Sequence, residues 1–315
     1  MAYVQKLTRS DLLQRQSLPL EAKIVMAQTR IRQWYDHWNG QVSVSFSGGK
    51  DSTVLLDLVW DLYPDVPAVF VDTGLEYPEV RQFVRTYENV IILRPEMSFK
   101  EVITSYGYPV VGKEVARTIR YAQQGSAWAL RKLAGLNPDG SVSRWNSSHY
   151  HQWAHLVHAP FKVSDICCEI MKKKPLVQYQ RESKRLPFLG TMACESVRRQ
   201  SAYLQAGCNA YEGSHKRSMP LAVWTEQDVL QYILDRGLKI PTVYGDIVRD
   251  EKGQLRTTGA QRTGCMFCAF GAQCEKSPNR FEKLKETHPK QYDFCMRDEN
   301  GLGLGAVLDY MGIKH

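Results

Sequence analysis

Six consecutive residues carry the backbone and side-chain types that bind phosphate: positions 47–52, with the sequence SGGKDS. Two adjacent glycines allow a tight turn in which backbone N–H groups approach an anion closely. An apolar run at 42–46 precedes the turn and a helical pattern follows at 53–59. A helix that starts here would add unpaired N–H donors and its positive dipole end. The sequence therefore predicts a phosphate-binding loop, with a plain glycine turn as the alternative.

The spacing within this loop differs from G-x-x-x-x-G-K-S/T, the P-loop of the common nucleoside triphosphatases. It resembles instead the PP-loop of the ATP pyrophosphatase superfamily, which includes the phosphoadenosine phosphosulfate (PAPS) and adenosine phosphosulfate (APS) reductases and several thiolation enzymes. The resemblance implies an adenine nucleotide alpha-hydrolase-like fold, with Lys50 and Asp51 as catalytic residues. The loop residues that it assigns to nucleotide binding are Ser47, Gly48, Gly49 and Ser52.

Three charged residues outside the loop are further candidates for nucleotide binding. Asp72 follows a buried-strand pattern, so its carboxylate would emerge at the sheet edge and contact nucleotide or metal, with helix capping as the alternative. The segment GTMACESVRR at 190–199 resembles the family pattern G-x-R-x-x-E-S-x-x-R, which assigns Glu195 and Arg199 to the site. Met192 occupies the arginine position of the sulfonucleotide reductases, and its thioether lacks the forked donors that bind a phosphosulfate.

Two pairs of cysteines have the type and spacing of soft-metal ligands. Thiolates suit iron–sulfur clusters or zinc, and a C-x-x-C loop lets two sulfurs reach one centre. The segment CCEIMKKKPL at 167–176 resembles C-C-x-x-R/K-K-x-x-P-L of the APS reductases, and CMFC at 265–268 resembles their later C-x-x-C. The resemblance implies one 4Fe–4S cluster, with zinc as the alternative, on Cys167, Cys168, Cys265 and Cys268. Cys274 is an alternative ligand, so the number of thiolate ligands stays open between three and four.

Two other patterns point to structure rather than to chemistry. Thr225 followed by Asp228 has the spacing of a helix capping box, which favours a stabilising role. The remaining cysteines have no partner at ligand spacing, and we expect them to be buried apolar residues: Cys194, Cys208 and Cys295.

Alternating strands and helices must position these residues. Helices are predicted at about 21–38, 53–59 and 77–88, and strands at 42–46, 68–71, 90–93 and 186–190, of which 68–71 has the pattern of a buried strand. Such alternation predicts an α/β fold, a doubly wound and mainly parallel sheet that binds ligands at the carboxyl ends of its strands. We expect three parts: an N-terminal helical segment at 1–40, a PP-loop nucleotide-binding domain at 41–235, and a C-terminal subdomain with cluster ligands at 236–315.

Composition and charge limit the class of protein. The 315 residues are 43% hydrophobic, enough for a full core, and no apolar run approaches the about 18 residues of a membrane span. The start of the chain has no signal-peptide pattern, so we expect a cytoplasmic protein without a membrane partner. The net charge is +8, and residues 110–220 hold 17 basic but 7 acidic residues. This excess favours a polyanionic partner, a nucleotide or a nucleic acid, with a solvated charged face as the alternative.

These observations together predict an enzyme of the PAPS reductase family, an ATP pyrophosphatase that uses ATP and Mg²⁺ to adenylate an acceptor for sulfur transfer. The expected acceptor is a nucleic acid, and the sulfur donor is unknown. One alternative is an APS or PAPS reductase that forms sulfite; Met192 argues against it, as does the end of the chain, where Cys295 is the last thiol. A second alternative is a nucleotide-binding subunit of a modification or defence complex. Either a homo-oligomer or a complex subunit is compatible with the sequence.

Overall fold

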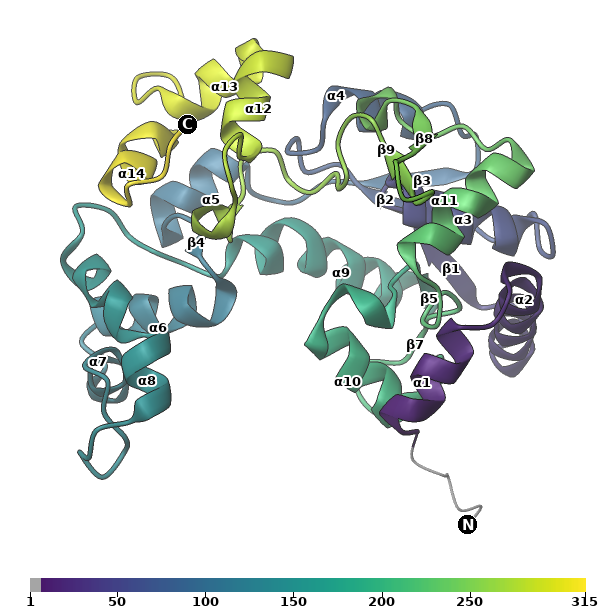
Figure 1. The fold of residues 1–315 in the computed structure, drawn as a ribbon, viewed down its shortest axis with the longest axis horizontal. Coiled ribbons are helices and arrows are strands. Elements are labelled where there is room, and N and C mark those ends of the chain that lie inside the picture. The colour runs from purple at the N-terminus through teal and green to yellow at the C-terminus, as the bar shows by residue number, and fades with distance from the viewer. Residues whose placement is uncertain (1–6) are drawn as a thin grey trace. The chain divides into compact units, whose positions relative to one another are not determined.

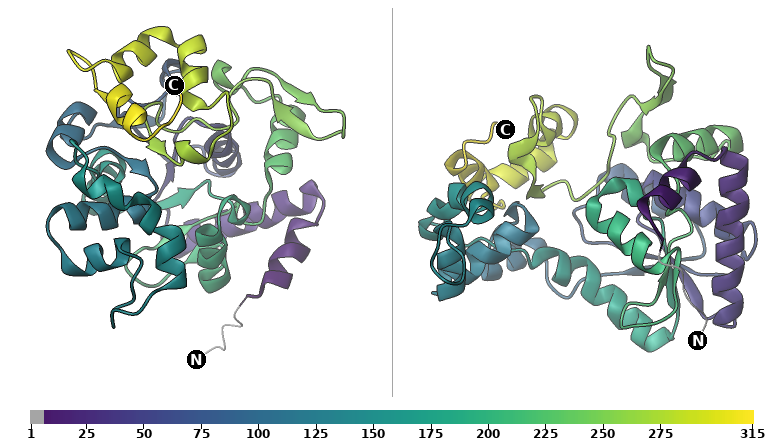
Figure 2. Two further views of the ribbon diagram at one scale, coloured as in Figure 1. Left: turned by 60° about the vertical axis from the view of Figure 1, so that its left-hand side comes forward. Right: turned by 60° about the horizontal axis from the view of Figure 1, so that its bottom comes forward.

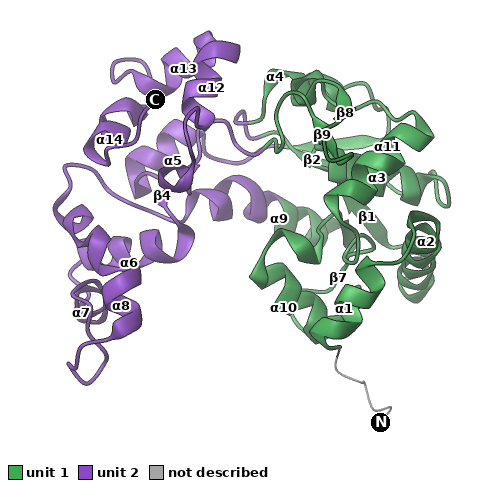
Figure 3. Ribbon diagram, viewed as in Figure 1, with its two compact units in different colours: residues 1–72, 76–93, 176–263 green, residues 73–75, 94–175, 264–315 purple. Residues whose placement is uncertain are grey.

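The computed structural model describes residues 7–315, which form two compact units (Figure 1; Figure 3). Unit 1 contains residues up to 72 together with 76–93 and 176–263. Unit 2 contains residues 73–75, 94–175 and 264–315. The chain therefore crosses between the two units several times and ends in unit 2. This partition differs from the three consecutive ranges expected from the sequence, because residues 264–315 share a unit with 94–175.

Unit 1 is built on a six-stranded sheet in the order β3-β2-β1-β5-β7-β6. Neighbouring strands are parallel except β6, which pairs with β7 in the antiparallel sense. Because the order runs outward from β1 in both directions, the sheet is doubly wound, as predicted, and β1 marks the topological switch point. The strands are β1 (Val42–Ser45), β2 (Ala68–Val71), β3 (Val90–Leu93), β5 (Leu186–Leu189), β6 (Asn209–Ala210) and β7 (Arg217–Ser218).

Helices flank this sheet (Figure 2). Helix α3 (Lys50–Trp60) packs against α2 (Leu20–His37) and α11 (Glu226–Arg236), and its apolar residues are almost all buried. The α2 pattern predicted from the sequence is confirmed, since Ala27, Ile31 and Trp34 lie in the core. The other elements of unit 1 are α1 (Arg9–Gln16), α4 (Pro78–Val84), α10 (Val197–Ala206), the 3₁₀ turns η3 (Ala193–Glu195) and η4 (Thr242–Tyr244), and the hairpin β8 (Ile247–Arg249) and β9 (Leu255–Thr257).

Unit 2 is mostly helical and contains one short parallel pair, β4 (Val110–Val111) with β10 (Ala269–Phe270). This pair joins the two stretches of chain that make up most of the unit. Helix α9 (Lys174–Ser183) begins at the end of the first stretch and continues into residues of unit 1. The remaining elements are α5 (Phe99–Tyr106), α6 (Lys113–Gln123), α7 (Ala127–Leu133), α8 (Arg144–His149), η1 (His151–His158), the π-helix η2 (Glu169–Lys173), η5 (Ala272–Cys274), α12 (Arg280–Thr287), α13 (Pro289–Met296) and α14 (Leu304–Tyr310).

One local prediction is confirmed and another differs from the structure. The strand predicted at 90–93 is β3, an edge strand, and its Ile91 and Ile92 side chains are 37% and 45% exposed, because β3 has a neighbour on one side only. The helix expected at 77–88 begins at Pro78, as predicted, but ends at Val84. Within residues 7–315, no helix has both the length and the apolar character to cross a membrane.

Candidate functional site

The phosphate loop, residues 47–52, lies at the carboxyl end of β1 and leads directly into α3. Gly48 has φ of +72°, and a Cβ built there would lie 2.6 Å from Val84 Cγ2, so only glycine fits this turn. The hydroxyls brace the turn: Ser47 Oγ and Ser52 Oγ lie 3.0 Å apart, and Ser52 Oγ donates to the Gly49 carbonyl at 2.8 Å. Gly49 is the N-cap of α3 and has no side chain to cap it, which favours an anion at the first-turn amides.

Lys50 has a buried side chain whose amino group lies among oxygen atoms. Its Nζ lies 3.4 Å from Asp51 Oδ1, 3.3 Å from Glu226 Oε1 and 3.2 Å from the Gln261 carbonyl oxygen, to which it donates. Burial acts to lower the Lys50 pKa, but the negative charge of Asp51, together with Tyr244 and Glu226, outweighs burial and raises it. Lys50 is therefore a fixed cation next to the loop at neutral pH.

Tyr244 of η4 covers one side of the phosphate loop. Its hydroxyl accepts the Lys50 backbone N–H at 3.2 Å and shares a hydrogen bond of 2.8 Å with the Thr263 hydroxyl. A Cβ on Gly49 would lie 3.1 Å from Tyr244 Oη. The sequence gives no signal for a role of Tyr244, Gln261, Thr263 or Glu226 at the loop, because no motif connects these positions with residues about two hundred positions earlier.

Asp72 follows β2 and is 8% exposed. Its carboxylate forms a two-point ion pair with Arg81 of α4: Nε to Oδ1 is 2.9 Å and Nη2 to Oδ2 is 2.9 Å. The N-cap of α4 is Tyr77, so the alternative in which Asp72 caps the next helix is wrong. The role of Asp72 in nucleotide or metal binding stays a prediction.

Glu195 and Arg199 lie in η3 and α10 and form an ion pair with each other. A Glu195 oxygen also accepts the Met192 backbone N–H at 2.8 Å. Burial lowers the pKa of Arg199 and the positive charge of Arg262 lowers it further, whereas the negative charge of Asp51 acts in the opposite sense. Asp51 therefore connects the loop electrostatically with Arg199, and a second arginine, Arg262, stands close to it.

The prediction that Cys194 is buried is wrong. Cys194 is exposed, whereas Cys208 and Cys295 are buried as predicted. Cys194 Sγ lies 3.5 Å from the Trp224 carbonyl oxygen. Partial burial raises the pKa of its thiol, and the charges of Asp51 and Glu226 raise it further. The position in η3 faces the charged groups around the loop rather than the core, which the sequence pattern could not indicate.

Thr225 and Asp228 form the predicted capping box at the start of α11. Thr225 donates its backbone N–H and its hydroxyl to Asp228 Oδ2, both at 2.7 Å. Asp228 also accepts from Lys23 of α2 at 2.7 Å, an ion pair in which the lysine side chain is 3% exposed. The stabilising role assigned to this motif is confirmed, and it fixes α11, which carries Glu226.

The cysteine set, defined as Cys167, Cys168, Cys265 and Cys268, lies entirely in unit 2. Cys168 is the N-cap of the π-helix η2, and its Sγ lies 4.0 Å from Cys167 Sγ. The Cys268 backbone N–H donates to the Cys265 carbonyl at 3.2 Å, closing the turn of the C-x-x-C loop. Cys268 directly precedes β10. Because β10 pairs with β4, the C-x-x-C loop is held next to the start of β4.

The electrostatics of the cysteine set show that its members interact. The hydrogen bond to Cys168 and burial raise the pKa of Cys167, and the charges of the other cysteines of the set raise it further. The hydrogen bond from Cys167 and the positive charges of Lys113 and Lys172 lower the pKa of Cys168. A thiol that ionises readily beside two lysines has the donor chemistry of a metal thiolate.

No group of three or more His, Cys, Asp or Glu side chains in residues 7–315 is arranged to hold a metal ion. The alternative ligand Cys274 is exposed at the end of η5. Thiols that influence one another in this way have the donor chemistry of an iron–sulfur or zinc site, and their role as ligands stays a prediction. The backbone beside them is unusual, since Val111 at the end of β4 has φ of +63°, a conformation that a β-branched residue rarely adopts.

Comparison with known proteins places the chain in a family. A sequence model of the phosphoadenosine phosphosulfate reductase domain matches residues 41–115 and 110–269. The chain belongs to this family. The match includes the phosphate loop and all four members of the cysteine set.

Three relatives show how far the similarity extends. An uncharacterized protein of Methanocaldococcus jannaschii is 23% identical over 272 residues, which are 84% of this chain and 49% of the relative. Sulfate adenylyltransferase subunit 2 of Streptomyces lavendulae is 27% identical, over 64% of this chain and 55% of the relative. Adenosine 5′-phosphosulfate reductase 1 of Bacillus subtilis is 27% identical, over 38% and 56%. The chain thus spans about half the length of the curated relatives it matches.

A crystal structure of PAPS reductase from Candida auris, a phosphate complex, aligns with a TM-score of 0.41 and 15% identity over 79% of this chain and 98% of that one.

Proposed function

We propose that this member of the PAPS reductase family binds ATP at the phosphate loop and transfers its adenylyl group to an acceptor with release of pyrophosphate. The observation that carries the proposal is the buried Lys50 ammonium, held beside the loop by Asp51, Glu226 and the Gln261 carbonyl. A preorganised cation and a helix start with no side-chain cap favour the charge that develops on a leaving pyrophosphate. A relative named for sulfate adenylyl transfer supports the same class of reaction.

In this mechanism the acceptor oxygen attacks the α-phosphorus of ATP. The bond between the α-phosphorus and the oxygen that bridges to the β-phosphorus breaks, and pyrophosphate leaves with the electron pair. The loop amides and the Ser47 and Ser52 hydroxyls bind the β- and γ-phosphates, and Lys50 neutralises their charge. Mg²⁺ would share that charge, and Asp51 at the start of α3 is the carboxylate nearest to the loop amides.

This mechanism requires that the Tyr244 hydroxyl be displaced from the phosphate loop. Its hydroxyl holds the Lys50 backbone N–H, which is one of the donors that a phosphate would use. A bound phosphate oxygen would replace Tyr244 Oη as the acceptor of this N–H. ATP binding is therefore expected to shift η4 and Thr263 away from the loop.

The cysteine set would hold the 4Fe–4S cluster in the proposed sulfur transfer. The supporting observations are the hydrogen-bonded pair of adjacent thiols, the electrostatic influence of Cys265 and Cys268 on it, and the positive charges of Lys113 and Lys172. A bound cluster would supply redox chemistry or carry the sulfur that replaces the adenylylated oxygen.

A nucleic acid is the proposed acceptor, on the basis of surface chemistry in unit 2. Trp128 and Trp145 are 48% and 63% exposed, and Trp145 stacks with His149 at a ring distance of 4.8 Å. Arg131 and Lys132 of α7 lie in the same group of helices. Exposed aromatic rings among cations are the elements on which unpaired bases stack. The basic excess in residues 110–220 supports the same class of partner.

The decisive experiment measures the products of ATP turnover. Purified protein is incubated with ATP labelled at the α- and γ-phosphates, Mg²⁺, and bulk transfer RNA or duplex DNA of random sequence. We expect pyrophosphate and a nucleic acid that carries the α-phosphate label from the wild type, and a loss of both of at least about a hundredfold in Lys50→Ala, since one preorganised charge contributes several kcal/mol. Lys252→Ala, an exposed lysine of the same unit, is the matched control. Release of ADP and inorganic phosphate would contradict the proposal.

Sulfonucleotide reduction is the second candidate, favoured by the relative named as an APS reductase. Against it, Met192 occupies the position where those enzymes have an arginine, and its side chain is 3% exposed within the apolar core of unit 1. A core methionine offers no donors to a phosphosulfate. Sulfite release from APS or PAPS with thioredoxin as reductant would establish this candidate in place of adenylyl transfer.

A further inference from the structure

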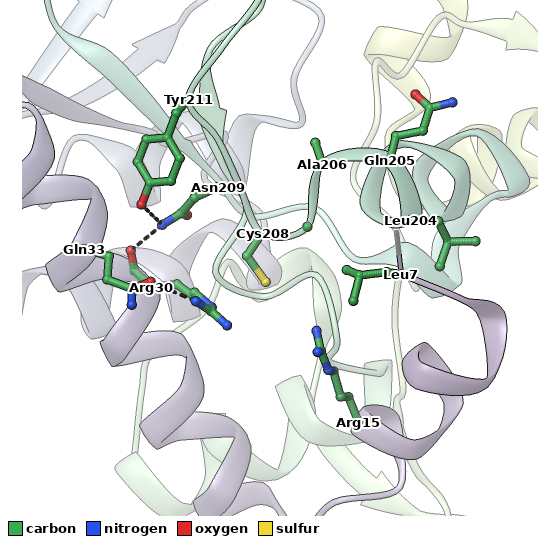
Figure 4. Close-up of a pocket in the computed structure, with 11 residues that line it drawn as sticks. Leu7, Arg15, Arg30, Gln33, Leu204, Gln205, Ala206, Cys208, Asn209 and Tyr211 are labelled. Atoms are coloured by element: carbon green, nitrogen blue, oxygen red, sulfur yellow. Dashed lines mark hydrogen bonds between the residues drawn. The ribbon is translucent and has the colours of Figure 1, made fainter. Parts of the chain in front are cut away.

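A cavity lined in part by polar side chains lies in unit 1 (Figure 4). Its volume is about 250 Å³, and residues of α1, α2, β6 and the C-terminal end of α10 line it. It shares no lining residue with positions 47–52. This arginine cavity, named for Arg15 and Arg30, is therefore independent of the site proposed for ATP.

Two arginines direct their charge into the cavity. Figure 4 shows the guanidinium groups of Arg15 and Arg30 pointing into the same space, with Cys208 between them. Arg15 donates to the Tyr203 hydroxyl at 2.7 Å, and Arg30 donates to Gln33 Oε1 at 2.8 Å. These partners are neutral, and neither arginine forms an ion pair within the described part of the chain.

The other polar groups of the cavity carry no negative charge. They are three amide side chains, a phenol hydroxyl and a thiol: Gln33, Gln205, Asn209, Tyr211 and Cys208. Burial raises the pKa of Cys208 against the opposing influence of Arg30 and Arg15, so the thiol is neutral. The nearest carboxylate that interacts with Arg15 is Asp11, and its oxygen already accepts the Thr8 N–H at 2.7 Å and the Thr8 hydroxyl at 2.6 Å in the capping box of α1.

Two half-buried guanidinium groups that share a space repel each other, and an anion between them would remove that repulsion. The planar fork of arginine matches the oxygen spacing of phosphate and sulfate. The volume lies just below the usual range for drug-sized ligands, which favours a small ligand.

We propose that the arginine cavity binds a tetrahedral oxyanion, phosphate or sulfate, either as the free ion or as the terminal group of a small molecule. The site is separate from the phosphate loop, so the proposal does not depend on ATP binding there.

The test titrates the wild-type protein with potassium phosphate or potassium sulfate, against potassium chloride at matched ionic strength. Calorimetry gives the affinity, and the Nε–H signals of Arg15 and Arg30 in NMR spectra report binding in the cavity itself. Because a phosphate can also occupy the loop, the titration is repeated with Lys50→Ala. We expect the signals of both arginines to shift with phosphate and sulfate in both proteins.

The matched variants are Arg15→Gln and Arg30→Gln, each of which removes one fork of donors. Each should weaken the anion affinity of the cavity by about tenfold or more, whereas Lys50→Ala should leave it unchanged. Arg15→Lys and Arg30→Lys keep the positive charge and remove only the guanidinium fork. They serve as controls for misfolding of the glutamine variants, and they should weaken anion binding less. Arginine signals that do not move, or an affinity that falls only in Lys50→Ala, would overturn the proposal. A methyl phosphate titration then separates the free ion from an ester, which the 250 Å³ volume should also admit.

Discussion

The phosphate loop and the cysteine set are both built from short motifs, but they are assembled in different ways. The loop is six consecutive residues whose turn, serine hydrogen bonds and helix start are local. The cysteine set joins two motifs nearly a hundred positions apart, and two strand contacts connect them: β10 pairs with β4, and Tyr108, just before β4, bridges to Val163, just before Cys167. A local motif carries its own geometry, whereas a motif assembled by tertiary packing depends on every element that brings its halves together.

Their electrostatics differ in the same way. In the loop, Lys50 remains a cation because oxygen atoms from α3, α11 and the segment after β9 surround it. In the cysteine set, adjacent thiols share a hydrogen bond, and the pKa of Cys168 falls while that of Cys167 rises. The loop already carries the cation that an anion would bind. In the cysteine set, a metal cation would be needed to neutralise the charge of more than one thiolate.

The largest effect is expected from removing one thiol of the cysteine set. Cys268→Ser should abolish bound iron and the visible absorption of anaerobically purified protein, because a cluster of thiolate ligands loses one of its anchors. Cys274→Ser should leave both unchanged if four ligands come from the set. Cys194→Ser, an exposed cysteine of unit 1, is the matched control. Equal iron in Cys268→Ser and the control, or zinc in place of iron, would contradict the cluster.

A glycine substitution tests how strictly the loop is built. Gly48→Ala should lower the free energy of unfolding by about 2–4 kcal/mol, since φ of +72° strains an L-residue and the new Cβ would meet Val84 and Val80 within 3 Å. Gly253→Ala has nearly the same φ, +75°, with no atom near its Cβ, and should cost about 1 kcal/mol. Chemical denaturation followed by circular dichroism measures both. Equal losses would show that close packing at Gly48 contributes nothing.

Tyr244 offers a smaller and opposite effect. Tyr244→Phe removes the hydroxyl that occupies the Lys50 N–H, so the affinity for ATP should rise by about two- to tenfold if displacing it costs one hydrogen bond. Equilibrium dialysis with ATP and Mg²⁺ measures the change. Thr263→Val, which removes the partner of that hydroxyl, is the companion variant and should act in the same direction. Weaker ATP binding in Tyr244→Phe would show that the hydroxyl belongs to the bound state.

The smallest effect is the pH dependence of the Lys50 contacts. The folded-state pKa of Lys50 lies above its ordinary value of 10.5, so its stabilising contribution is fully present below that value and is lost as pH rises through the folded-state pKa. The difference in unfolding free energy between wild type and Lys50→Met should therefore stay constant from pH 7 to about 10 and shrink above it. A difference that already changes between pH 7 and 9 would contradict a raised pKa.

Much of unit 1 could be predicted from the sequence because its signals are local. The apolar stripe of α2, the strands β1, β2 and β5, and the spacing of Thr225 and Asp228 each depend on neighbours within a few positions. The carboxyl end of β1 was likewise predictable as the place of the loop, since parallel strands bind ligands there.

The sequence could not indicate which residues approach from a distance. Tyr244 and Gln261 reach Lys50 across about two hundred positions, and Cys194 is exposed at the charged site although its type favours burial. The exposure of Ile91 and Ile92 followed from the sheet order, which no apolar run specifies.

By itself, the sequence determined a glycine-rich phosphate loop between a strand and a helix, and two cysteine pairs with the chemistry of a soft-metal site. Only the tertiary structure decided that Lys50 is buried among oxygen atoms, that Tyr244 covers the loop, and that Arg15 and Arg30 share a cavity. The reason is physical: turns, caps and periodicities are energies of neighbouring residues, whereas burial and the pairing of charges are energies of packing between distant parts of the chain.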